Sequence, residues 1–186
     1  MKELFSIGYQ GYPGVDFFIN DLKYFGVKML VDVRSVPYSK YYSDWNKEML
    51  ERRLQIEGIQ YLNMKNEFGA RQTNPKYFRN GRMDFELFSE SVQFMKGIEF
   101  VENIDKTICL MCMEKLPSMC HRSILVGRAF RERGCSVKHI ISGRKVVNQF
   151  DIELKLVKTY FGIVDMNTNF ISAAYELRNN EIGWKK

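Results

Sequence analysis

The sequence lacks the segments that direct a chain into or through a membrane. Its beginning, MKELFSIGYQGYPG, contains neither a long apolar core nor a small-residue cleavage site. No apolar segment among the 186 residues reaches the length of a membrane span, and no internal repeat or low-complexity segment is present. We therefore expect a cytoplasmic protein with no membrane partner.

The signatures of common cofactors are absent as well. No glycine-rich dinucleotide pattern follows the first apolar segment, and the phosphate-loop lysine motif is missing. The four cysteines are few and clustered, unlike the dispersed framework of a small secreted domain, so we expect them to be reduced. No cofactor is predicted.

The composition is that of a globular protein with one substantial core. Hydrophobic residues make up 45% of the chain and charged residues 27%, and 186 residues are few for two domains. The net charge of +6 and the pI of about 9.1 favour a phosphate-bearing partner, either a nucleotide or a nucleic acid. However, Lys and Arg are interleaved with Asp and Glu, which is typical of solvated helix faces, so charge alone does not establish such a partner.

Patterns typical of strands and helices alternate along the chain. Apolar segments of strand length cover residues 4–8, 28–33, 59–62, 107–113 and 136–141. Helical periodicity covers residues 15–25, 46–57, 85–102, 120–133, 146–161 and 170–177, and a long polar loop occupies residues 63–82. This order predicts a single-domain α/β fold, with a mainly parallel sheet of about five strands and helices on both faces. We expect residues 1–145 to form the α/β domain and residues 146–186 to form a helical extension packed on it.

Residues 108–122, ICLMCMEKLPSMCHR, carry the strongest chemical signal. Three of the four cysteines and one of the two histidines lie here, where a buried strand ends and a helix begins. Ligands of open α/β sheets bind at this edge, and the amino end of a helix favours anions. A thiolate at Cys120 would be stabilised by this position and by its neighbours His121 and Arg122.

The predicted topology gathers further side chains at the same edge, because right-handed crossovers bring the carboxyl ends of parallel strands together. The candidate catalytic residues are Asp32, Cys112, Glu114, Cys120 and His121, and the candidate substrate- or anion-binding residues are Tyr9, Arg34, Arg71, Lys115 and Arg122. In the functional interpretation the arginines bind an anion, one cysteine is the nucleophile and the histidine carries the proton.

Several of these residues also have a structural interpretation. Cys112 ends an apolar strand, where an unreactive buried cysteine is common. Cys120 can pack inward, and Arg122 can pair with Glu114 or Asp32. Asp32 itself suits either a general base or the partner that holds an arginine in place. The residues expected simply in the core are Cys109, Cys135 and His139.

A metal site is one further alternative for this segment. Cys109, Cys112, Cys120 and His121 together offer four ligands. Zinc knuckles place their Cys-x-x-Cys pair on a tight turn, whereas the two residues between Cys109 and Cys112 keep the segment extended and apolar. We therefore predict no metal site.

Seven short segments together resemble a known family. They are IGY at 7–9, VDVRS at 31–35 followed by Pro37 and Ser39, GIQY at 58–61, FGAR at 68–71, LMCMEK at 110–115, CHR at 120–122 and VKHI at 137–140. On these motifs the chain resembles the family catalogued as domain of unknown function 488. The resemblance implies a compact α/β domain with the motifs gathered on one side, and it implies no reaction.

The sequence leaves three functions open. The first is an enzyme that acts on a nucleotide or a nucleic acid through the cluster at the sheet edge. The second is a non-catalytic module that binds the same ligands with the same basic edge. The third is a protein-interaction domain in which the Cys, His and Arg residues form only a structural network.

Overall fold

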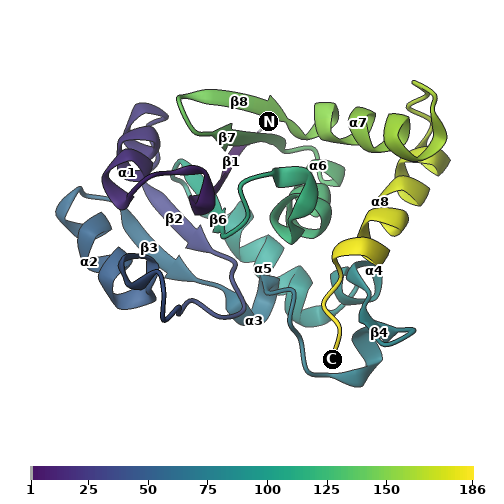
Figure 1. Cartoon of the computed structure of the whole chain (residues 1–186), viewed down its shortest axis with the longest axis horizontal. Helices are drawn as coiled ribbons and strands as arrows, with labels where there is room; N and C mark the ends of the chain where they lie inside the picture. Colours follow the sequence, from purple (N-terminus) through teal and green to yellow (C-terminus); the bar gives the residue numbers. More distant parts are fainter. Residues whose placement is uncertain (1) are drawn as a thin grey trace.

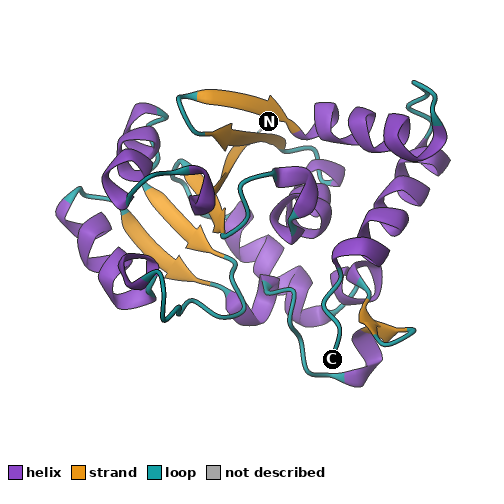
Figure 2. Ribbon diagram, viewed as in Figure 1, coloured by secondary structure: helices purple, strands orange, loops and turns teal. Residues whose placement is uncertain are grey.

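The computed structural model describes residues 2–186, which are arranged around a six-stranded sheet (Figures 1 and 2). The strands are β1 Glu3–Gly8, β2 Met29–Asp32, β3 Gln60–Asn63, β6 Ile108–Cys112, β7 Ser136–Ile141 and β8 Lys145–Asn148, and their order across the sheet is β3-β2-β6-β1-β7-β8. All neighbouring strands are parallel except β7 and β8, which are antiparallel. The prediction of an α/β fold with a mainly parallel sheet is therefore confirmed.

Helices cover both faces of the sheet. One face carries α1 Val15–Tyr24 and α2 Lys47–Ile56, and the other carries α3 Lys65–Phe68, α5 Val92–Glu102, α6 Arg128–Glu132 and α7 Gln149–Phe161. The remaining elements are α4 Phe85–Ser89, α8 Thr168–Ile182, the hairpin strands β4 Phe78–Arg79 and β5 Arg82–Met83, a π-helix at Arg122–Gly127 and short 3-10 turns. No helix within residues 2–186 is both long and apolar enough to cross a membrane.

Strand β6 lies between β2 and β1 and is buried along its whole length. Its side chains alternate between the two faces, because successive residues of a strand point in opposite directions. Cys109 and Met111 enter the core beneath α1 and α2, whereas Leu110 and Cys112 enter the opposite core. Cys109 is thus confirmed as a core residue, and it is separated from Cys112 by the sheet.

The structure corrects several predicted elements. Residues 85–102 form two helices, because Ser91 caps α5 by accepting a hydrogen bond from the N–H of Phe94. Residues 145–148 form the edge strand β8, so the helix predicted from residue 146 begins at Gln149. The turn into β8 uses Gly143 and Arg144 at positive φ. The loop predicted at 63–82 contains α3 and the β4-β5 hairpin, and α8 extends beyond the predicted 170–177.

Helices α7 and α8 form an angled arm beside the sheet, and the chain then runs along the β4-β5 hairpin (Figure 1). The N–H of Met83 in β5 donates to the carbonyl oxygen of Trp184 at 2.8 Å. The end of the chain is therefore fixed close to the residues that precede α4.

Buried hydrogen bonds connect the sheet to this arm. Nδ1 of His139 lies 2.6 Å from the hydroxyl of Ser6, and Nε2 lies 2.6 Å from Oε1 of Gln149. Nε2 of Gln149 donates to the hydroxyl of Tyr175 at 2.7 Å, and that hydroxyl donates to Glu153 at 2.8 Å. Because Oε1 of Gln149 can only accept, Nε2 of His139 is the donor and Nδ1 accepts from Ser6. His139 is thus a satisfied core histidine, as the sequence predicts.

This buried histidine makes the stability of the fold fall in acid. Burial, with the charge of Arg122 acting in the same direction, lowers the pKa of His139 to about 3. The imidazole of the unfolded chain takes up a proton near pH 6.5. The contribution of the neutral His139 to the free energy of unfolding is therefore complete above pH 6.5 and is lost as the pH falls towards 3. The loss amounts to about 2 kcal/mol at pH 5. We expect His139→Gln to lose about 2 kcal/mol less than the wild type between pH 7 and pH 5 in urea unfolding. Equal losses in the two proteins would contradict the neutral buried imidazole.

Candidate functional site

The turn after β6 is folded back over the end of β1. A Cβ atom on Gly8, the last residue of β1, would overlap the carbonyl oxygen of Glu114. Arg122 is completely buried, and its guanidinium donates to the carbonyl oxygens of Glu114 at 2.6 Å and Lys115 at 3.2 Å. The glycine and the guanidinium together fix the turn that begins at Cys112.

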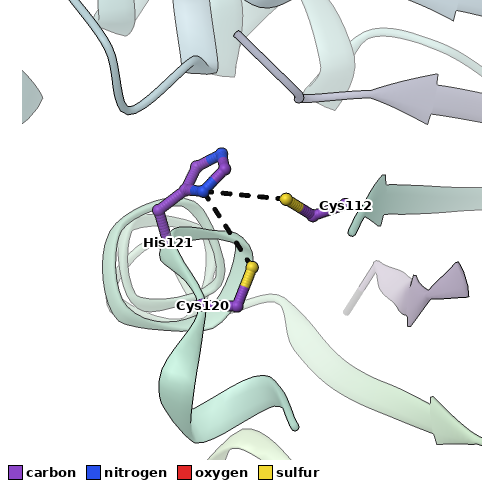
Figure 3. A group of neighbouring side chains, drawn as sticks. All are labelled: Cys112, Cys120 and His121. Atoms are coloured by element: carbon purple, nitrogen blue, oxygen red, sulfur yellow. Dashed lines mark hydrogen bonds between the residues drawn. The ribbon is translucent and has the colours of Figure 1, made fainter. Parts of the chain in front are cut away.

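Four side chains meet beside this turn, and we call Cys112, Glu114, Cys120 and His121 the thiol cluster. Oε2 of Glu114 accepts from Sγ of Cys112 at 3.0 Å and from Sγ of Cys120 at 2.9 Å. Nδ1 of His121 lies 3.8 Å from Sγ of Cys112 and 3.9 Å from Sγ of Cys120 (Figure 3). Cys112 comes from β6, whereas Cys120 and His121 immediately precede a π-helix, Arg122–Gly127. Such π-helical turns are frequent at functional sites.

The imidazole of His121 is held in one orientation. Its Nε2 lies 3.0 Å from the carbonyl oxygen of Val33, just beyond β2. A carbonyl oxygen only accepts, so Nε2 carries a proton and donates it. The other nitrogen, Nδ1, therefore faces the two sulfur atoms, as Figure 3 shows.

The surroundings divide the protons unevenly within the thiol cluster. Burial raises the pKa of Cys112 well above its ordinary value. Burial acts the same way on Cys120, but the hydrogen bond with Cys112, the charge of Arg122 and the contact with His121 outweigh it and lower the pKa of Cys120. The pKa of His121 is raised, because the hydrogen bond and charge of Cys120 outweigh burial. Burial and the neighbouring Cys120 raise the pKa of Glu114. Cys120 is thus the more acidic of the two thiols in the cluster.

The thiol cluster lines an open cavity of about 370 Å³. Its two cysteines and its histidine are at most 8% exposed, whereas Tyr38 and Tyr42 in the same lining are more than half exposed. The cluster therefore forms the inner end of the cavity and the tyrosines form its rim. The volume falls within the range of small-molecule sites, about 300–1,000 Å³.

The structure brings seven of the ten candidate residues into the lining of this cavity: Tyr9, Arg34, Arg71, Cys112, Glu114, Cys120 and His121. The other three, Asp32, Lys115 and Arg122, lie outside the lining. Asp32 and Arg122 are completely buried, and Lys115 is exposed on the turn after β6.

Arg34 is engaged by protein groups. Its guanidinium and backbone N–H donate to the carboxylate of Asp32 over 2.6–3.0 Å, and Nη1 donates to the carbonyl oxygen of Trp45 at 2.9 Å. The hydroxyl of Tyr61 donates to the same carboxylate at 2.5 Å. Both carboxylate oxygens of Asp32 are thus occupied, and the guanidinium of Arg34 is held by Asp32 and Trp45 while the residue lines the cavity.

Three of the lining residues that were not predicted from the sequence help to shape the cavity. Ser35 lines it and accepts a hydrogen bond from the N–H of Arg71 at 2.9 Å, which fixes the loop that carries this arginine. Tyr42 lies on the rim, and Trp184 reaches the lining from the end of the chain. The density of tyrosines between residues 38 and 42 was a usable signal for Tyr42. No pattern in the polar C-terminal segment pointed to Trp184.

Part of the thiol cluster has the spacing of metal ligands. Sγ of Cys112, Sγ of Cys120 and Nδ1 of His121 all lie within 4.8 Å of one another. Cys109 is on the opposite face of the sheet, so the four-ligand set considered from the sequence is not assembled. A set of three ligands is assembled instead.

The comparisons with known proteins follow the same segments. A family model described as "Domain of unknown function DUF488" matches residues 14–129, which is more than half of the chain. The match includes the whole thiol cluster and Arg122, and it stops before α7 and α8. No curated protein and no solved structure matches the chain.

The buried pair of Asp32 and Arg34 leads to a prediction about stability. Asp32→Asn removes the anionic partner and leaves a buried guanidinium uncompensated, so we expect the free energy of unfolding to fall by about 3–5 kcal/mol. Urea unfolding measures the loss, and Asp44→Asn, at an exposed position, is the control with the same chemical change. A loss below about 1 kcal/mol, the usual size for a surface ion pair, would contradict this account.

Proposed function

Because the chain belongs to the family described as a domain of unknown function, DUF488, whose description names no reaction, we propose a function from the geometry of the cavity. The protein is an enzyme whose reaction centre is the thiol cluster. Its substrate is a nucleotide or a nucleic acid, bound in the cavity above that cluster.

The observation that carries this proposal is the position of the thiol cluster. Two sulfur atoms, an imidazole nitrogen and a carboxylate oxygen converge at the inner end of an open cavity, with sulfur-to-oxygen distances of 2.9 and 3.0 Å. A purely structural network has no need of a cavity that leads to it. Thiol, imidazole and carboxylate groups are those that act as nucleophiles and proton carriers in enzymes.

The walls of the cavity suit a planar ring that carries a phosphate group. Tyr38 and Tyr42 offer exposed aromatic rings at the rim, and Trp184 lies in the lining. Aromatic side chains stack on nucleobases without strong sequence preference. Arg71 is exposed, lines the cavity and makes no ion pair among residues 2–186, so its guanidinium is free to bind phosphate.

The remaining candidate residues act as positioning residues in this proposal. Asp32 holds Arg34 at the cavity wall, and Arg122 holds the turn that carries Glu114. Glu114 accepts from both thiols and is the proton acceptor of the centre. Asp32 was considered as a general base from the sequence, but its occupied oxygens favour the role of an arginine partner.

Ligand binding tests the substrate class. We expect nucleotides or short oligonucleotides to raise the melting temperature of the reduced protein. We expect Arg71→Ala to weaken their binding roughly tenfold, because losing a hydrogen bond to a charged group costs about 1.5 kcal/mol. Arg52→Ala removes the same charge from an exposed position on α2 and is the control. Tighter binding of oligonucleotides than of mononucleotides identifies nucleic acid as the substrate. Equal losses in both variants would show that only net charge matters.

Turnover of a ligand found in this way tests the reaction centre. His121→Asn removes the proton carrier, and we expect it to lower the rate by roughly 10²–10⁴-fold while ligand binding is retained. Cys135→Ser changes a cysteine outside the cavity lining and should leave the rate unchanged. Salt-dependent binding without any product would favour the binding module instead.

A further inference from the structure

We propose that the thiol cluster is a zinc site, with Cys112, Cys120 and His121 as protein ligands and a fourth position open to the cavity. The site itself stands on the geometry of these three residues. Its use in catalysis rests on the proposed function, and with zinc bound a metal-bound water takes the place of a thiol nucleophile, because both sulfur atoms and Nδ1 of His121 are then occupied as ligands.

The distances between the three ligand atoms fit one tetrahedral ion. Zn–S bonds of about 2.3 Å and a Zn–N bond of about 2.0 Å at tetrahedral angles separate sulfur from nitrogen by about 3.5 Å. Nδ1 of His121 lies 3.8 Å from Sγ of Cys112 and 3.9 Å from Sγ of Cys120, so small side-chain rotations close the site. Figure 3 shows all three atoms directed towards a common point between β6 and the π-helix.

The histidine is oriented as a metal ligand. Nε2 donates to the carbonyl oxygen of Val33, which fixes the ring and leaves the lone pair of Nδ1 on the side of the sulfur atoms. Ligating histidines commonly donate their second N–H to a carbonyl group or a carboxylate in this way. The orientation is therefore present before any ion binds.

The chemistry of the donor set selects the ion. Two thiolates and an imidazole favour zinc over hard cations such as Mg²⁺ or Ca²⁺, which prefer oxygen ligands. Both sulfur atoms are buried, and deprotonation of both would place two negative charges side by side, which requires a cation between them. A bound dication meets this need, with the buried Arg122 supplying further positive charge nearby.

The open fourth coordination position of the zinc site suggests a role for Glu114. Its carboxylate touches both sulfur atoms but is not among the atoms that lie within 4.8 Å of one another. Catalytic zinc sites have three protein ligands and a water molecule, whereas structural sites have four protein ligands. A zinc-bound water can pass one proton to Glu114 and become hydroxide, so the site suits hydrolysis of the substrate in the cavity.

Metal analysis of the purified full-length chain tests the proposal. After reconstitution with Zn²⁺ under reducing conditions and removal of free metal, we expect about one zinc per chain in the wild type. Loss of a group that only hydrogen-bonds to a metal ligand weakens metal binding roughly tenfold to a hundredfold. Cys112→Ala and Cys120→Ala each remove a ligand itself, so we expect each to weaken zinc binding by more than this. Cys135→Ala, which removes a buried cysteine outside the cluster, is the matched control and should bind like the wild type.

Cobalt supplies a readout that does not depend on the folding of a variant. Co²⁺ added to the wild type should give the thiolate-to-metal charge-transfer band and the strong visible bands of a tetrahedral site, and Zn²⁺ should abolish them. A wild type that binds neither ion, or a Cys112–Cys120 disulfide that persists under these conditions, would overturn the proposal. A loss of zinc in Cys135→Ala as large as that in Cys112→Ala or Cys120→Ala would also overturn the proposal.

The outcomes keep this inference separate from the proposed function. Zinc on the three ligands without nucleotide binding would support the site and contradict the substrate class. Nucleotide turnover by a protein that holds no zinc would support the enzyme and contradict the metal.

Discussion

The buried guanidinium of Arg122 is the interaction on which the candidate site depends. It is completely buried, its Nε has no hydrogen-bond partner within residues 2–186, and its other nitrogens donate to two main-chain carbonyl groups instead of a carboxylate. Burying a cation in this way costs free energy. What it secures is the turn after β6, which passes so close to Gly8 that no side chain fits there. That turn brings the end of β6 back to the start of the π-helix, and the two thiols meet as a result.

The pleat of the central strand is the second constraint. Because β6 is covered on both faces, its residues must all be apolar, and cysteine meets that requirement at both Cys109 and Cys112. Only the second of them is at the carboxyl end of the strand and on the face of the π-helix. The same residue type therefore has two fates within four positions, with Cys109 in the core and Cys112 in the thiol cluster.

Much of the fold could be predicted from the sequence, because strand-length apolar segments and helical periodicity alternate clearly up to Ile141. The edge strand β8 could not, since its four residues are too few to show a strand period and they lead directly into the helical pattern of α7. The break between α4 and α5 depends on a single serine cap, which periodicity does not detect. The first error leaves out an antiparallel edge strand of the sheet, whereas the second leaves the topology unchanged.

The candidate site was predictable where it depends on topology and not where it depends on side-chain contacts. The carboxyl ends of parallel strands lie on one edge of the sheet, which places Tyr9, Arg34 and Cys112 on the same side. Sequence spacing could not show that Arg34 is held by Asp32 and Trp45, or that Arg122 turns away from the cavity to bind carbonyl groups. Cys109 and Cys112 cannot act as a zinc-binding pair, because they lie on opposite faces of the sheet. Cys112, Cys120 and His121 are instead brought together by the turn after β6, which sequence spacing does not show.

We infer that this turn creates a metal-binding reaction centre at the inner end of a cavity. Anomalous diffraction at the zinc absorption edge, from crystals of the reduced protein grown with zinc, would locate the ion. We expect one strong peak between Sγ of Cys112, Sγ of Cys120 and Nδ1 of His121, with a further ligand on the cavity side. Zinc found only on surface residues, with the three side chains unchanged around an empty centre, would contradict it.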